Sequence, residues 1–153
     1  IADRRGVDFN PLDLTRYQDA LRLQAYLWPD QPDQMARTRA AFANQHAKVD
    51  RGDAIDWLKH RVQQPQDGRI HLIYHTIAWQ YFPPQQQEQG HKIMVEAGAR
   101  ATDQAPLAWL AMEADDTDQG GAAVSLTAWP SGVKFDLGRT DFHSRWVRWA
   151  PPI

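Results

Sequence analysis

The stretch IHLIYHTIAWQYF, residues 70–82, decides the fold, because no other part of the sequence favours a β-strand as strongly. Its first seven residues are mostly branched or aromatic, and residues of these types are enriched in strands. Turn residues bound the stretch, with Asp67 and Gly68 before it and Pro83 and Pro84 after it. We therefore expect a strand over Ile70–Thr76 that lies in the centre of a sheet, with parallel neighbours.

Strands and helices alternate on either side of this stretch. Apolar residues at spacings of three and four, such as Leu14, Tyr17 and Leu21, indicate the helices. The predicted order is a strand near Arg5–Phe9, helices after Thr15 and after Pro32, a strand near Ala47–Val49, a helix after Gly52, the strand Ile70–Thr76, a helix from about Pro84 to Ala97, and a strand over APLAWLAME, residues 105–113. Such alternation is typical of parallel strands joined by right-handed helical crossovers.

The last third of the chain has a different pattern. After the acidic, Gly-rich segment MEADDTDQGG (112–121), the runs AVSLTAW (123–129), VKFDL (133–137) and RWVRW (145–149) favour short strands joined by tight turns. Consecutive strands of this kind pair antiparallel. The predicted fold class is therefore α/β, with a partial Rossmann-like sheet of parallel strands, helical crossovers and antiparallel C-terminal strands. The chain has the length of a single domain, residues 1–153.

Composition and charge narrow the classes of function. Seventeen Lys and Arg against nineteen Asp and Glu give a net charge of −2, so the sequence shows no basic surface for nucleic acid or an anionic membrane. No run approaches the roughly 18 apolar residues of a membrane-spanning helix. The absence of cysteine is typical of a reducing compartment, and the cytoplasm is the expected location. The expected partner is a small-molecule ligand, with neither nucleic acid nor membrane.

Polar residues at the ends of the first two strands are candidates for ligand binding, because ligands of open α/β sheets bind outside the carboxyl ends of the strands. Asp8 and Asn10 close the first strand, where a carboxylate can accept both hydroxyls of a ribose. Asp53 and Ala54 follow the second strand, where Asp53 can accept a hydrogen bond from an adenine amino group. Capping of the following helix is the alternative role of each aspartate, and the residues alone favour capping for both.

The strand at residues 70–76 ends in His75 and Thr76, and Trp79, Gln80 and Tyr81 follow. Polar side chains that leave so apolar a strand favour an active-site edge, because their burial without partners is costly. We therefore expect these residues, with His75 and Thr76 first among them, to lie at the edge of an active site. His71 and His75 share one face of the strand, but no third ligand follows at a metal-binding spacing, so we predict no metal site. The sequence also contains no GxSxG, P-loop or GxGxxG motif.

Six segments together resemble one bacterial family, known as domain of unknown function 2332, and the resemblance extends over nearly the whole chain. They are GVDFNPLDL (6–14), LRLQAYLWPDQ (21–31), VDRGDAIDWL (49–58), IHLIYHTIAWQYFP (70–83), APLAWLAME (105–113) and HSRWVRW (143–149). The parts WPDQ (28–31) and HTIAWQYFP (75–83) are the most distinctive. In that family a further region precedes the part that this chain contains. The resemblance therefore implies that the polypeptide extends N-terminally, and we expect this remainder to cover one side of the strand at Arg5–Phe9.

The order of elements is also similar to that of the Rossmann-like S-adenosylmethionine-dependent methyltransferases. This resemblance implies S-adenosylmethionine as the cofactor. The strand and glycine loop that hold the methionine part in those enzymes are not in this sequence. The positions that match by order are the ribose site at Asp8 with Asn10 and the adenine site at Asp53 with Ala54. The resemblance also implies that His75 and Thr76 are the catalytic residues at the substrate edge, with His75 as general base.

A second hypothesis is a non-catalytic protein-interaction domain on a degenerate Rossmann-like scaffold. It assigns the function to the Trp-rich, antiparallel end of the chain. It predicts an exposed apolar patch around Trp129, Trp146 and Trp149, because large exposed apolar patches mark interaction sites. The residues alone leave both hypotheses open.

Overall fold

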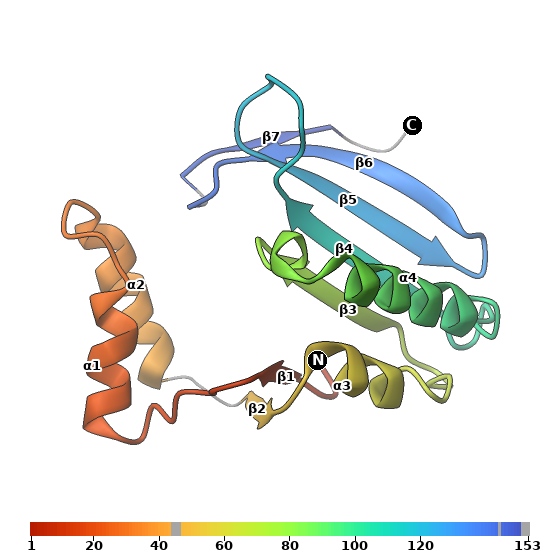
Figure 1. Cartoon of the computed structure of the whole chain (residues 1–153), viewed down its shortest axis with the longest axis horizontal. Helices are drawn as coiled ribbons and strands as arrows, with labels where there is room; N and C mark the ends of the chain where they lie inside the picture. Colours follow the sequence, from red (N-terminus) through yellow and green to blue (C-terminus); the bar gives the residue numbers. More distant parts are fainter. Residues whose placement is uncertain (44–46, 144, 151–153) are drawn as a thin grey trace. The chain divides into compact units, whose positions relative to one another are not determined.

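The structure is a computed structural model that describes residues 1–43, 47–143 and 145–150 (Figure 1). The chain forms two compact units, Ile1–Trp57 and Leu58–Ile153. The boundary falls inside helix α3, which spans Ala54–Arg61. The single domain expected from the chain length stays a prediction.

The first unit is built on a pair of parallel strands. It contains, in order, β1 (Arg5–Asp8), α1 (Tyr17–Ala25), α2 (Pro32–Ala43) and β2 (Lys48–Arg51). Asp8 lies opposite Arg51, so the carboxyl ends of β1 and β2 meet at the same end of the sheet. Arg5 joins the strands through two bonds to the Asp50 carboxylate, of 2.6 and 2.9 Å. These bonds and one from the Trp57 indole lower the pKa of Asp50 to about 2. The predicted order of elements in this unit is confirmed.

The second unit is a five-stranded mixed sheet with a helix against one side (Figure 1). It contains β3 (His71–Thr76), the 3-10 helix η1 (Trp79–Tyr81), α4 (Pro84–Gly98), β4 (Leu107–Glu113), β5 (Ala122–Trp129), β6 (Val133–Thr140) and β7 (Val147–Trp149). The strands are ordered β3-β4-β5-β6-β7. β3 and β4 are parallel and connected through α4, whereas β4 to β7 are antiparallel. The predicted crossover and the predicted antiparallel end are confirmed, and the chain is a mixed α/β protein.

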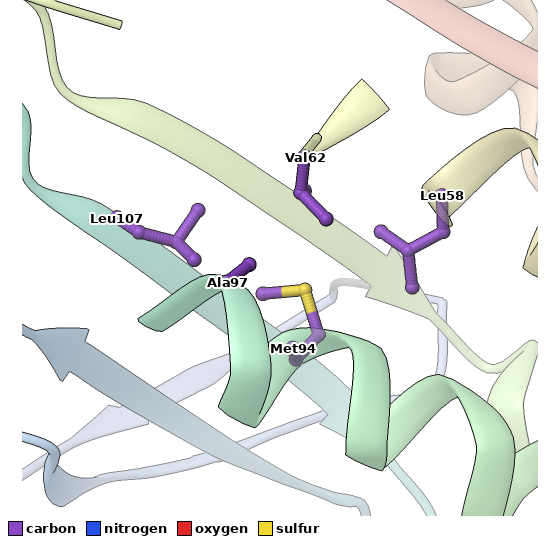
Figure 2. Close-up of a cluster of buried hydrophobic side chains, with 5 residues drawn as sticks. All are labelled: Leu58, Val62, Met94, Ala97 and Leu107. Carbon is purple, nitrogen blue, oxygen red and sulfur yellow. The ribbon is translucent and has the colours of Figure 1, made fainter. Parts of the chain in front are cut away.

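The apolar core of the second unit gathers around one methionine (Figure 2). The side chain of Met94 on α4 is fully buried. Its buried neighbours in this cluster are Leu58, Val62, Ala97 and Leu107. At the end of α4 the chain also needs a glycine, because a Cβ on Gly98 would lie 2.3 Å from the indole nitrogen of Trp129. This packing fixes α4 on β4.

The prediction that Ile70–Thr76 is a central strand is wrong for this sheet. β3 is an edge strand, and no strand of the described chain pairs with its other side. Burial alternates along β3, so that Leu72 and Tyr74 are 49% and 68% exposed while Ile73 between them packs on the core. A strand with one buried face usually alternates apolar and polar residues. Because the exposed positions of β3 are apolar as well, the sequence does not show this alternation.

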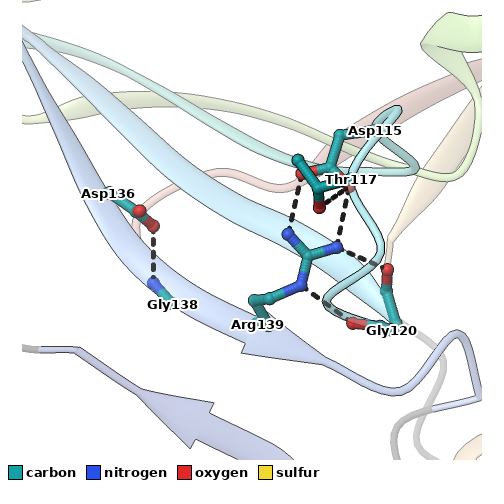
Figure 3. A network of polar contacts seen from close by, with 7 residues as sticks. Asp115, Thr117, Gly120, Asp136, Gly138 and Arg139 are labelled. Carbon is teal, nitrogen blue, oxygen red and sulfur yellow. Dashed lines mark hydrogen bonds and ion pairs between the residues drawn. The ribbon is translucent and has the colours of Figure 1, made fainter.

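A single arginine fixes the loop between β4 and β5 (Figure 3). The guanidinium of Arg139 on β6 donates two bonds to the Asp115 carboxylate, of 2.7 and 2.8 Å. It also donates to the backbone carbonyls of Gly120 and Gly121, at 2.8 and 2.9 Å. The bonds from Arg139 and from the Thr117 hydroxyl hold the pKa of Asp115 well below its ordinary value. The acidic loop is therefore tied at both of its ends.

Candidate active site

His75 and Glu113 form a hydrogen-bonded pair at the carboxyl ends of β3 and β4. The two strands are parallel and their last paired residues are Thr76 and Met112, so both carboxyl ends lie at one edge of the sheet. His75 Nδ1 lies 2.6 Å from Glu113 Oε1. A carboxylate only accepts hydrogen bonds, so the proton of a neutral imidazole here belongs on Nδ1, and Nε2 then presents a lone pair. Glu113 thus selects the tautomer that a general base needs.

The same Glu113 oxygen also holds the turn that follows β3. Oε1 accepts the backbone N–H groups of Ala78 and Trp79, at 2.9 and 3.0 Å. Ile77 makes the turn with a φ of 47°, in the left-handed region that a β-branched residue rarely adopts. Burial alone would raise the pKa of Glu113, but these three hydrogen bonds outweigh it and the pKa is lowered. The carboxylate is therefore the charged form at neutral pH.

Aromatic rings surround the imidazole. The Trp79 ring stacks on His75 with the centroids 5.0 Å apart, and the Trp109 ring is tilted at 5.7 Å. His91 on α4 completes the group, 5.4 Å from Trp79 and 4.9 Å from Trp109. Partial burial, the charge of Lys134 and the neighbouring His75 lower the pKa of His91. The base thus lies against flat, largely apolar walls.

Four buried polar atoms of this cluster have no hydrogen-bond partner. They are His75 Nε2, Glu113 Oε2 and the indole nitrogens of Trp79 and Trp109, and no other buried side-chain nitrogen or oxygen in the described chain lacks a partner. Buried polar groups in native proteins are nearly always paired, so each exception calls for an explanation. That all four belong to one cluster marks it as the candidate active site.

Thr76 lies apart from this cluster. It is exposed, and as the residue after His75 in a strand it points to the opposite face of the sheet. The structure therefore does not bring the two predicted catalytic side chains together.

Asp8 and Asn10 meet at the carboxyl ends of β1 and β2, as their positions in the sequence indicate. The Asp8 carboxylate is exposed and accepts the backbone N–H of Asn10 at 2.6 Å. The side-chain oxygen of Asn10 accepts a bond from Arg51 at 3.0 Å. Asp8 therefore makes a local turn and does not cap a helix through this bond. Its role at a ribose stays a prediction.

Asp53 caps helix α3. Its Oδ1 accepts the backbone N–H groups of Ile55 and Asp56, at 2.8 and 3.0 Å, as an N-cap aspartate does. The capping interpretation of Asp53 is thus confirmed. Ala54 is the first residue of that helix. Binding of adenine by Asp53 and Ala54 stays a prediction.

Sequence reasoning missed both Glu113 and Trp109. A signal for Glu113 was present, because it is a charged residue that ends the apolar strand APLAWLAME, just as His75 ends its own strand. Trp109 does pack beside the core, but it also contacts His75. The contact depends on the pairing of β3 with β4, which periodicity does not reveal.

The other features of the described chain that could form a site contain fewer reactive side chains than the His75 cluster. A shallow pocket at the amino ends of β3 and β4 is lined mainly by apolar and amide side chains, and no carboxylate lines it. Within residues 1–43, 47–143 and 145–150, no three His, Cys, Asp or Glu side chains gather where they could hold a metal ion. No helix in the same ranges has the length and apolar character to cross a membrane.

The fold and the cluster together define a mixed α/β protein whose candidate active site lies at the carboxyl ends of two parallel strands. Over residues 1–149 the chain matches the family described as "uncharacterized protein conserved in bacteria", DUF2332. The chain belongs to this family, as the resemblance of its segments predicted. Neither a curated protein nor a solved structure matches it.

Proposed function

We propose that the protein is an enzyme in which His75 removes a proton from a small-molecule substrate. The observation that carries the proposal is the 2.6 Å contact of His75 Nδ1 with Glu113, which leaves the buried Nε2 without a partner. A positioned general base of this kind typically contributes about 10²–10⁴-fold to a rate. Glu113 orients the ring, and its negative charge stabilises the imidazolium that forms when Nε2 takes the proton.

We further propose that S-adenosylmethionine is the cofactor. When bound, it supplies an electrophilic methyl group, and a substrate that has lost a proton to His75 is the matching nucleophile. Asp8 fits the ribose position, because it is an exposed carboxylate at the carboxyl end of a parallel strand and Asn10 fixes its orientation. The adenine position has less support, because Asp53 Oδ1 already accepts two backbone N–H groups.

Calorimetric titration of S-adenosylhomocysteine into the full-length protein tests the cofactor. Asp8→Ala should weaken binding roughly tenfold to a hundredfold, because it removes charge-assisted bonds to the ribose. Asp53→Ala should lower the melting temperature through the lost cap. Absence of binding to the wild type, or unchanged binding to Asp8→Ala, would exclude this cofactor site.

Release of S-adenosylhomocysteine from S-adenosylmethionine, measured with a panel of hydroxyl and amine acceptors, tests the base. His75→Ala should keep cofactor affinity and lower turnover by about 10²–10⁴-fold. Thr76→Ala, on the opposite face of the strand, is the matched control and should keep turnover. Equal turnover in wild type and His75→Ala would remove His75 from the reaction.

The interaction-domain hypothesis keeps one observation in its favour. On the edge strand β7, Val147 and Trp149 are 65% and 59% exposed, and Trp146 before it is 40% exposed. Trp129 instead packs beside the core, so the predicted patch lacks one of its three tryptophans. If no adenosyl compound binds and Trp149→Ser abolishes an association seen by analytical ultracentrifugation, the second hypothesis replaces the first.

A further inference from the structure

The unpartnered atoms of the His75 cluster describe the hydrogen-bonding character of the group that they would bind. Two of them, the indole nitrogens of Trp79 and Trp109, can only donate. The other two, His75 Nε2 and Glu113 Oε2, accept when His75 carries its proton on Nδ1. A matching group must therefore both donate and accept hydrogen bonds within a small volume.

Charge argues against one common group at this position, and hydrogen-bonding character argues against another. A carboxylate or phosphate only accepts, and it would face the Glu113 carboxylate. No Arg or Lys of the described chain donates to His75, Glu113, Trp79 or Trp109, and the charge of Lys134 acts on His91. An ammonium only donates, and it leaves both indole N–H groups unpartnered. A neutral hydroxyl can donate to His75 Nε2 and accept from both indole N–H groups, so that only Glu113 Oε2 stays without a partner.

The aromatic rings of the cluster indicate which kind of compound bears the hydroxyl. Trp79, Trp109 and His91 meet at centroid distances of 4.9 to 5.4 Å, which is the range in which aromatic rings attract each other. A further flat ring that lies against them would be attracted in the same way. A hydroxyl on an aromatic ring also has a pKa of about 10, as in tyrosine, so an imidazole removes its proton more readily than that of an aliphatic alcohol.

We propose that the substrate group bound in this cluster is the hydroxyl of a phenol-type compound. Its O–H donates to His75 Nε2, and its oxygen accepts from the indole N–H groups of Trp79 and Trp109. In the reaction the proton moves to Nε2 and the electron pair of the O–H bond stays on the oxygen, which becomes the nucleophile. This inference rests on the proposed function of His75 and adds the substrate class. Because His75 Nε2 is buried, the substrate reaches it only when side chains of the cluster move.

Nuclear magnetic resonance of the indole N–H groups in the full-length protein tests the inference with three probes of similar size. Phenol should shift the resonances of Trp79 and Trp109. Toluene, which lacks the hydroxyl, and benzoate, which is an anion, should each bind at least tenfold more weakly. If benzoate or toluene binds as tightly as phenol, or if phenol moves neither resonance, the inference is wrong.

Conservative variants test the two donors separately. Trp79→Phe and Trp109→Phe keep an aromatic ring, assign the resonances by their loss, and should each weaken phenol binding about fivefold. Trp129→Phe, which alters a tryptophan outside the cluster, should leave binding unchanged. Unchanged binding in both cluster variants would overturn the inference. If phenol does not bind but His75→Ala still abolishes methyl transfer, the proposed substrate class is wrong and the proposed function is kept.

Discussion

Replacement of Glu113 tests the candidate site through stability alone, without knowledge of a substrate. The side chain is 16% exposed, and one of its oxygens accepts bonds of 2.6, 2.9 and 3.0 Å. A bond to a charged group contributes about 1.5–3 kcal/mol, but three bonds to one oxygen near solvent are not additive. We expect Glu113→Ala to lower the free energy of unfolding by about 2–4 kcal/mol. Glu113→Gln keeps an acceptor oxygen and should cost about 1–2 kcal/mol.

The effect should also depend on pH in a defined direction. The pKa of Glu113 is lowered in the folded protein from its ordinary value of 4.5, so the folded state binds this proton less tightly than the unfolded state. Its stabilising contribution is therefore complete above pH 4.5 and is lost as the pH falls through the folded-state pKa. The difference between the wild type and Glu113→Gln should shrink on acidification below that pH.

Urea unfolding followed by tryptophan fluorescence measures both effects, since Trp79 and Trp109 lie beside the pair. Glu96→Gln is the matched control, because its side chain is 57% exposed on α4. It should change the free energy of unfolding by less than about 0.5 kcal/mol. If Glu113→Ala is as stable as this control at pH 7, the hydrogen bonds that we assign to Glu113 do not hold the turn after β3.

Substitutions at three further sites, two of them with a second variant for comparison, test the packing and the cap. Met94→Ala should lower the free energy of unfolding by about 2–5 kcal/mol, because it removes the central buried side chain of the core. Val95→Ala, at an exposed position of α4, should lower it by less than about 0.5 kcal/mol. If urea unfolding gives equal values for the two variants, Met94 is not at the centre of the core. Asp53→Ala should cost about 1 kcal/mol through the lost cap, and an unchanged melting temperature would refute this role. Gly98→Ala should lower the free energy of unfolding by about 1–3 kcal/mol, because the added methyl group clashes with Trp129. Trp129→Leu in the same chain should restore part of that loss. If it restores none, the clash with Trp129 is not the cause.

The order of elements was predictable because it depends on local signals. The period of the apolar residues changes between helices and strands, and Pro and Gly mark most of the boundaries, as at Pro84, the first residue of α4. The position of a strand in its sheet depends on distant pairing. Leu72 and Tyr74 made β3 look buried on both faces, yet both side chains are largely exposed. An apolar strand therefore does not reveal how many neighbours it has.

The sequence predicted His75 of the candidate site but not the residues around it. His75 stood out because a polar residue ends an apolar strand, and the same argument applied to Glu113 would have paired them. The aromatic walls could not be predicted, because Trp109 and His91 reach His75 and Trp79 only through the β3–β4 register and the packing of α4. Thr76 shows the opposite error, since neighbours in sequence along a strand point to opposite faces.

The bonds that Arg139 makes to both ends of the β4–β5 loop have a practical consequence for protein engineering. Arg139 binds Asp115 near the start of the β4–β5 loop and the carbonyls of Gly120 and Gly121 at its end, so the two ends stay together whatever the tip contains. Closing a longer flexible loop costs only about 0.6 kcal/mol for each doubling of its length. A short epitope or a fluorescent label inserted between Asp116 and Gln119 should therefore be carried on the surface as a reporter, while the sheet on which it is mounted keeps its register.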